Sequence, residues 1–355
     1  MSGFALKIIR ESTGLTQAAL AEQLVVDLAT VQGWESGRRP LTALRSADLT
    51  RLRAKLVSLG APPDAFRVLR DAIDADLLIA SAVQAGDQLT APAEHPLALT
   101  VNRCDLTNLI TWPFTGNTPT PLAKLSRPRT ARRGPSADRP LLSADERTRF
   151  FDHLLVTADA SRADSDALLR RQTIYLLGFD QRGTSRQWLL DEQRNALRSV
   201  GRNESVASWV TVRSSAVALA QVGDRSPLHG FVTRGLADER QEIANLNYWA
   251  YWVGEIRETY TDDRFMSYYG GRRWSGVHVL EHLLDRMHAN SNQLTLDAHT
   301  LWALMLARPR VLDHQPALRV SAAQQIDRAL DSLGLAARTR KELASVACAI
   351  RLAGR

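Results

Sequence analysis

The amino-acid sequence predicts an all-α protein with a small N-terminal helical domain and a larger helical C-terminal region. Three observations predict this class. Apolar residues recur at helical spacing through most of the 355 residues. Glycines and prolines separate these stretches. Only Leu97, Leu99 and Val101 alternate as in a strand, and this segment is interpreted either as one short strand or as an extended connection.

The first helices are predicted within residues 6–24. Leu6 and Ile9 form the apolar stripe of a first helix, which ends at Gly14. Thr16 is suited to the N-cap of a second short helix, because its hydroxyl can accept a hydrogen bond from a free backbone N–H. That helix carries three apolar residues at helical spacing, namely Leu20, Ala21 and Leu24.

A tight turn and a third helix follow. The turn is Val25-Val26-Asp27, and Asp27 is predicted to cap the third helix. Val31 and Trp34 are expected to face the core, and Gly37 to stop the helix. Two short helices joined by a tight turn form a helix-turn-helix.

The stretch from Leu6 to Pro40 carries three ordered motifs: L-x-x-x-R, G-L-T-Q-x-x-L-A-x-x-L and T-V-x-x-W-E-x-G-R-R-P. In these motifs it resembles the phage-repressor (Xre/Cro) helix-turn-helix family of transcriptional regulators. The resemblance spans the N-terminal sixty or so residues and does not extend into the C-terminal region. In that family the third helix enters the DNA major groove, and the second helix meets a phosphate.

Position by position, the resemblance implies DNA contacts for six residues. Gln17 takes the phosphate-contacting position, and the base-facing positions fall on Leu28, Ala29, Thr30, Gln32 and Gly33. The family's ion pair between the first and third helices falls on Arg10 and Glu35, with a structural role. Arg38 and Arg39, just after the third helix, fit phosphate contacts, or else form a solvated helix end.

The chain departs from the family at two points. Val25 stands where the family usually has a glycine with positive φ, so we expect strain or a rebuilt turn. The base-facing set also holds few polar groups. Gln32 can pair with adenine and Thr30 can touch thymine, so direct readout is expected to be modest and DNA shape to contribute.

We divide the chain into residues 1–60 (helix-turn-helix), 61–112 (helical extension and connection), 113–143 (linker) and 144–355 (C-terminal domain). Pro63-Asp64 opens a long helix whose apolar stripe is Phe66, Leu69, Ile73, Leu77 and Leu78. The linker holds six of the fourteen prolines and a net charge of +5. Its arginines add non-specific DNA affinity in one interpretation and only solubility in the other.

The C-terminal domain is predicted to dimerise or regulate, and its helix pairs also fit degenerate helical repeats. Its helices are expected at 144–156, 164–178, 186–199, 205–221, 236–260, 275–289, 294–307, 321–333 and 336–353. The aromatic set Tyr248, Trp249, Tyr251 and Trp252 is interpreted as core or as a helix–helix interface. Residues 268–274 form a loop that lines a pocket in one interpretation.

One string in this domain suggests an enzyme. His278, Glu281 and His282 form H-x-x-E-H, a pattern of zinc peptidases. On a helical wheel these residues share a polar face with Asp285 and His288, opposite an apolar face, so we interpret them as solvated. We therefore expect no catalytic residues, no metal and no cofactor.

Taken together, these features predict a cytoplasmic transcriptional regulator. The net charge is +7. No run of about 18 apolar residues and no secretion signal is present, so no membrane association is expected. Two cysteines, Cys104 and Cys348, are interpreted as reduced core residues. The expected partners are an operator in double-stranded DNA, a second copy of the chain, and a peptide or protein at the C-terminal domain. One alternative is a helical scaffold for a peptide or protein; a weaker one is a zinc hydrolase with a DNA-binding head.

Overall fold

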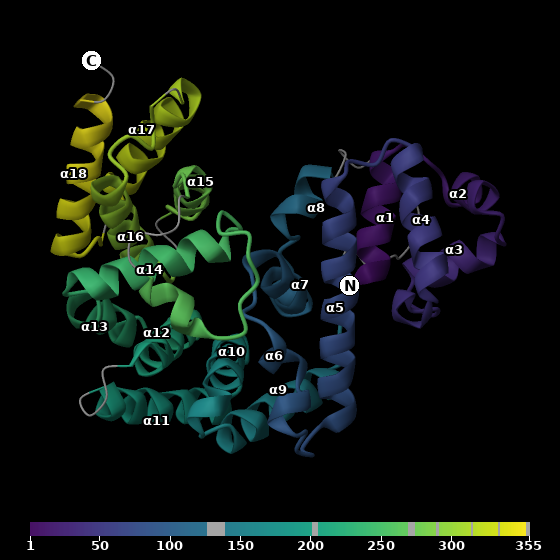
Figure 1. Cartoon of the computed structure of the whole chain (residues 1–355), viewed down its shortest axis with the longest axis horizontal. Helices are drawn as coiled ribbons and strands as arrows, with labels where there is room; N and C mark the ends of the chain where they lie inside the picture. Colours follow the sequence, from purple (N-terminus) through teal and green to yellow (C-terminus); the bar gives the residue numbers. More distant parts are fainter. Residues whose placement is uncertain are drawn as a thin grey trace. The chain divides into compact units, whose positions relative to one another are not determined.

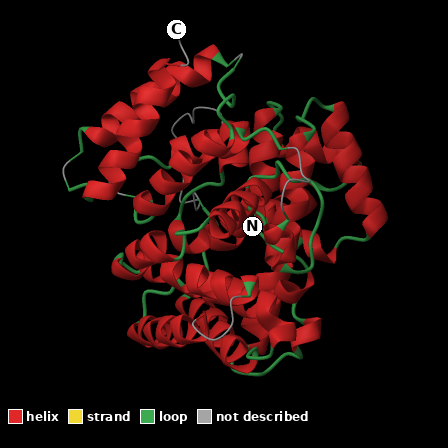
Figure 2. Ribbon diagram, turned by 60° about the vertical axis from the view of Figure 1, so that its left-hand side comes forward, coloured by secondary structure: helices red, strands yellow, loops and turns green. Residues whose placement is uncertain are grey.

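The structure is a computed structural model that describes residues 1–125, 139–200, 205–268, 274–288, 291–313, 315–332 and 334–352. Every regular element in these residues is a helix, which confirms the all-α class (Figures 1 and 2). The chain forms two compact units. The first contains residues 1–89 and 104–153, and the second contains residues 90–103 and 154–355.

The first unit is built on one long helix. This helix, α5 (Asp64–Ala85), confirms the prediction from Pro63-Asp64 and contacts α1, α7 and α8. Its apolar stripe is buried at Leu69, Ile73 and Leu78, whereas Leu77 faces solvent. The other elements of this unit are α1 (Ser2–Ser12), α2 (Gln17–Leu24), α3 (Leu28–Glu35), η1 (Leu41–Ala43), α4 (Ser46–Ser58), α7 (Cys104–Thr115), α8 (Thr120–Leu125) and the first part of α9 (Ala144–Ala160).

The first part of the linker predicted at residues 113–143 contains two helical segments, the end of α7 and the whole of α8. Pro113 lies inside α7, buried beside Trp112, which contacts the ring of Phe4 at 6.0 Å between centroids. Leu122 of α8 is also buried. Buried apolar residues between the prolines pack this stretch into the first unit. A prediction based on the density of prolines does not take these residues into account. Residues 126–138, with most of the predicted linker arginines, lie outside the described residues.

In the second unit, α12 (Val206–Gln221) contacts α10, α11 and α13. The α10–α12 crossing is close, because a Cβ on Gly178 would lie 2.7 Å from the Ala218 Cα. The predicted aromatic set on α14 (Glu239–Trp252) is buried, as expected for core. The remaining elements are η2 (Pro92–Glu94), α6 (Pro96–Leu99), η3 (Asp164–Asp166), α10 (Ala167–Leu177), α11 (Gly183–Val200), α13 (Ser226–Arg234), η4 (Asp263–Ser267), α15 (Val277–Asp285), α16 (Leu294–Ala307), α17 (Pro316–Leu330) and α18 (Ala337–Leu352).

Three helices of the second unit differ from the prediction. The alternating segment at Leu97 is the short helix α6, because Pro96 starts it and the His95 Nδ1 accepts a hydrogen bond from Leu97 N at 3.1 Å. Helix α13 was not predicted, because Pro227 stands in its first turn and not between two helices. Helix α14 ends at Trp252, before Gly254 at a φ of +85°, and not at residue 260.

Candidate nucleic-acid interface

The helix-turn-helix forms as predicted, and its turn keeps three residues. Val25 takes the left-handed conformation at φ 57° and ψ 49°, and it is the only non-glycine residue with positive φ in the described chain. Its N–H donates to Glu22 O at 3.1 Å, and Val26 N donates to Ala21 O at 3.0 Å. The turn is therefore not rebuilt, and the strain falls on Val25.

The two predicted caps differ. The Thr16 hydroxyl accepts a hydrogen bond from Ala19 N at 3.1 Å, which confirms it as the cap of α2. Asp27 does occupy the N-cap position of α3, but its side chain makes no capping hydrogen bond. Its carbonyl instead accepts from Thr30 N at 2.9 Å, so the predicted side-chain cap was wrong.

A buried ion pair joins α1 to the end of α3. Arg10 Nε donates to Glu35 Oε1 at 2.6 Å and Arg10 Nη2 to Glu35 Oε2 at 3.0 Å, and both side chains are buried. The third donor, Arg10 Nη1, reaches Leu15 O at 2.6 Å. This two-point geometry fixes the orientation of α3 against α1, as the resemblance implied.

Gln17 belongs to the same network. Its Nε2 donates to Glu35 Oε2 at 2.7 Å, and the side chain is half-buried. The resemblance implied that the Gln17 side chain faces a phosphate. In the structure its amide instead donates to Glu35, within the protein. The expectation came from sequence position, which does not determine the rotamer.

The solvent-facing side of α3 carries the candidate reading surface, defined as Leu28, Ala29 and Gln32. All three are exposed, and Leu28 retains 43% of its accessible surface. Val25 stands next to this surface and is 91% exposed. In the described chain the Gln32 side chain makes no hydrogen bond, which leaves both its donor and its acceptor available to a base edge.

Arg39 folds back along α3 and covers two of the predicted base-facing residues. Its Nη1 donates to the Thr30 hydroxyl at 2.8 Å. Gly33 is buried beneath it, since a Cβ on Gly33 would lie 3.1 Å from the Arg39 Cγ and Cδ. In this structure Gly33 is therefore covered by Arg39, whereas the resemblance implied that it faces a base. Its lack of a side chain makes room for the Arg39 stem, a contact that the linear sequence does not reveal.

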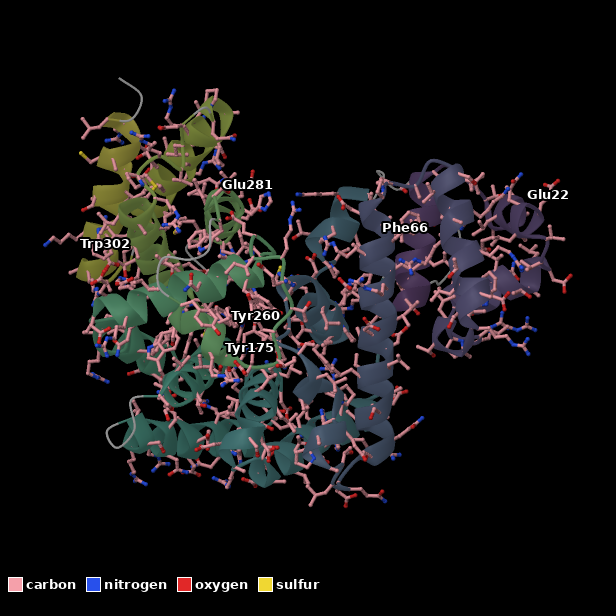
Figure 3. The ribbon with its side chains drawn as sticks, in the orientation of Figure 1. Glu22, Phe66, Tyr175, Tyr260, Glu281 and Trp302 are labelled. Atoms are coloured by element: carbon pink, nitrogen blue, oxygen red, sulfur yellow. The ribbon has the colours of Figure 1, made fainter. Side chains whose placement is uncertain are left out.

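Two cations stand at the C-terminal end of α3. Gly37 follows the helix at a φ of +78°, as predicted for its stop. Arg38 and Arg39 are both exposed, and Arg38 Nε donates to the Ser36 hydroxyl at 3.2 Å. The side chain of Glu22 on α2, an acid of the same domain, points outward from the unit (Figure 3).

The H-x-x-E-H string is only partly solvated. His278 and Glu281 are exposed, but the His282 ring lies 5.5 Å from that of Trp249. Burial, with a smaller contribution from Arg286, lowers the pKa of His282 to about 3. The expectation of a solvated His282 was therefore wrong. No group of three or more His, Cys, Asp and Glu side chains is placed to hold a metal ion in the described chain.

The cysteines also differ from their predicted core positions. Cys104 is half-buried in α7, and burial raises the pKa of its thiol, while Cys348 on α18 is exposed. The proposed pocket loop lies mostly outside the description, since residues 269–273 are not described.

The comparisons with known proteins concern the N-terminal part alone. Residues 3–69 match a family model described as a helix-turn-helix domain. No curated protein and no solved structure matches the chain. Among the described helices, none combines the length and the apolar character needed to cross a membrane. The chain thus carries an N-terminal helix-turn-helix domain and a larger helical region without a matching relative.

Proposed function

We propose that the chain is a cytoplasmic DNA-binding transcriptional regulator that reads an operator in double-stranded DNA, as the phage-repressor family does. The observation that carries the proposal is the exposed face of α3, with Leu28, Ala29 and Gln32 beside two arginines, in a segment that matches a helix-turn-helix domain. The buried Arg10–Glu35 pair holds this face in a fixed orientation.

The chemistry of this face divides the contacts into two kinds. Arg38 and Arg39 are exposed cations that suit phosphates, which position a protein on the duplex without reading its sequence. Gln32 offers a donor and an acceptor, the pattern that pairs with adenine. Leu28 and Ala29 offer apolar contact, as to a thymine methyl group. Because Gln32 is the one polar residue of the candidate reading surface, we expect direct readout of the bases to be modest and DNA shape to add to the specificity.

A small domain with few base contacts needs a second copy to bind an operator well. We therefore propose that the regulator acts as a homodimer on a two-fold site. The second unit, or the helices after residue 60, supplies the contact between copies, and the second unit also receives a signal or a protein partner. The proposal assigns the chain no catalytic step.

The test is binding of the purified protein to genomic DNA, footprinted at stated salt, followed by isotherms on the enriched site. We expect discrete enriched sites. Arg38→Ala should make the negative slope of log K against log salt shallower by about 0.9, the value for one phosphate contact. The matched control is Arg51→Ala, an exposed arginine of α4 that should leave the slope unchanged. Absence of any enriched site, with a folded protein, would contradict the proposed function.

A further inference from the structure

In the second unit, unpartnered polar atoms from four helices lie near Trp249. They belong to side chains that are buried or, for His282, nearly so. Within the described chain, these atoms have no hydrogen-bond partner: Arg213 Nε on α12, Asn245 Oδ1 and Trp249 Nε1 on α14, His282 Nε2 on α15, and Asp297 Oδ1 on α16. Native proteins leave few such groups, because each one costs about 1–3 kcal/mol. We call these five residues the Trp249 cluster.

Distances to the Trp249 ring place Arg213 and His282 of this cluster beside the indole, and Arg286 links Asp297 to the same ring. The Arg213 Cζ lies 5.5 Å from the Trp249 ring centre and 4.0 Å from that of Tyr248. The His282 ring centre lies 5.5 Å from the indole. The Cζ of Arg286 lies 5.9 Å from the same ring, and its Nε donates to Asp297 Oδ2 at 3.1 Å.

Arg213 carries a buried charge without a paired carboxylate. It is 4% exposed, and no ion pair in the described chain joins it to a carboxylate. The equally buried Arg171 shows the usual solution, since it pairs with both carboxylate oxygens of Asp263 at 2.6 Å. Burial lowers the pKa of Arg213, yet a guanidinium stays charged in proteins. The carboxyl group of Asp297 bonds to Arg286, and burial raises the pKa of Asp297, so this group does not neutralise Arg213.

Aromatic contacts and water explain only part of this arrangement. The rings of Tyr248 and Trp249 attract the Arg213 cation through their faces, but this leaves the Nε–H without an acceptor. Ordered water satisfies hydrogen bonds without supplying charge. An anion supplies both the missing acceptors and the missing negative charge.

We propose that the Trp249 cluster binds a small carboxylate that also carries a hydrogen-bond donor, the chemistry of an amino acid or a hydroxy acid. The Arg213 Nε–H and the Trp249 Nε1–H donate to the carboxylate. Asp297 Oδ1 and Asn245 Oδ1 accept from the ammonium or hydroxyl group. This site lies within the second unit and does not depend on DNA binding.

The test measures the melting temperature of the full-length protein with each of the twenty amino acids and with glycolate, L-lactate and L-malate. Sodium chloride at matched ionic strength is the reference. A ligand at about one hundred times its Kd should raise the melting temperature of the second unit by roughly 5–10 °C. Amino acids and hydroxy acids are separate arms, and either arm supports the proposal. Calorimetry should then give one site per chain.

Three variants decide whether the response belongs to this cluster. Arg213→Met should abolish it, and Trp249→Phe, which keeps a ring but removes the N–H, should weaken binding about tenfold or more. Arg194→Met, an exposed arginine of the same unit, should leave binding unchanged. If Arg213→Met does not fold, Trp249→Phe decides alone. The proposal is overturned if no compound exceeds the salt reference, or if the variants bind as the wild type does.

Discussion

At the scale of single residues, Val25 shows how a helix-turn-helix tolerates an unfavourable side chain. A β-branched residue in the left-handed region costs about 1–2 kcal/mol, yet the turn retains its geometry. The conformation is imposed by the hydrogen bonds from Val25 and Val26 to α2, together with the burial of Leu20 and Val31 on either side. Because Val25 is 91% exposed, its side chain contributes no packing that would offset the strain.

We therefore predict that Val25→Gly stabilises the first unit. Relief of the strain is partly offset by the added entropy of the unfolded glycine chain, which leaves a gain of about 0.5–1 kcal/mol. Urea unfolding measures the free energy. Val57→Gly, at a half-exposed helical position in α4, is the control and should destabilise instead. An unchanged or reduced stability for Val25→Gly would show that this turn is not strained.

Two glutamines of the helix-turn-helix are expected to have different roles, one in the stability of the domain and the other in contact with bases. Gln17→Ala removes the hydrogen bond to the buried Glu35, so we expect a loss of about 1.5–3 kcal/mol of stability. Gln32→Ala should change stability by less than about 0.5 kcal/mol, because the side chain is exposed. On the operator, Gln32→Ala should cost about 1–3 kcal/mol, with little loss on scrambled DNA. Equal losses on the two duplexes would exclude base reading by Gln32.

The Arg10–Glu35 pair could be predicted from the resemblance to the phage-repressor family, and the buried Trp34 from the apolar positions of the third helix. The Gln17 rotamer and the cover of Gly33 by Arg39 could not, since both depend on side-chain directions that spacing leaves free.

At the scale of elements, the effect of a proline on a helix depends on its position in that helix. Pro227 and Pro316 stand in the first turn of a helix, where a missing N–H is harmless, whereas Pro113 lies inside α7. The expectation that prolines separate helices therefore fails at the first two, and the expectation that clustered prolines mark a linker fails at the third. Helical periodicity predicted α9, α12 and α16 well, because their apolar positions are numerous, but proline alone does not distinguish a start from an end.

The ring of His299 on α16 joins this helix to α14 and α18. Its Nε2 lies 2.8 Å from Glu242 Oε1 on α14, and its Nδ1 lies 2.8 Å from Glu342 Oε1 on α18. Arg338 also contacts Glu342, at 2.8 Å. Burial opposes the imidazolium, but the hydrogen bonds to both carboxylates outweigh it and raise the pKa of His299.

We predict that the second unit loses stability as the pH rises above neutrality. A raised pKa in the folded state gives stability that is fully present below the unfolded value near 6.5. This stability is lost as the pH rises through the folded value. Urea unfolding at pH 6 and pH 9 measures the fall, which His299→Gln should abolish and His278→Gln, at an exposed position, should leave intact. An NMR titration that places the His299 pKa below 6.5 would contradict the assignment.

At the scale of the whole molecule, the boundaries of the two units differ from those suggested by composition. The proline-rich stretch marks residues 113–143, whereas the chain passes between units near residues 89, 103 and 153. Residues 90–103 belong to the second unit through backbone contacts. Val101 N donates to the O of Tyr260, which is labelled in Figure 3, at 2.8 Å. Tyr251, whose ring centre lies 5.7 Å from that of Tyr260, donates its hydroxyl proton to Val101 O at 2.7 Å. Such backbone contacts leave no pattern in the sequence.

The fragment 144–355, which the sequence delimits as the C-terminal domain, should therefore be less stable than the second unit of the intact chain. Without residues 90–103, the buried Gln172 amide loses Leu97 O at 2.6 Å and Asn102 N at 2.6 Å. The Tyr251 hydroxyl loses its acceptor, and the carbonyls of Tyr251 and Ile256 lose the Arg103 guanidinium at 2.9 and 2.7 Å. Two buried side chains without partners cost about 2–6 kcal/mol together.

A synthetic peptide of residues 90–103 should restore this stability when it is added to the fragment. Because the peptide binds only the folded fragment, the melting temperature should rise with peptide concentration. A scrambled peptide of the same composition is the control and should have no effect. If the fragment melts at the temperature of the second unit in the intact chain, residues 90–103 are merely a connection, and the boundary belongs where the prolines are.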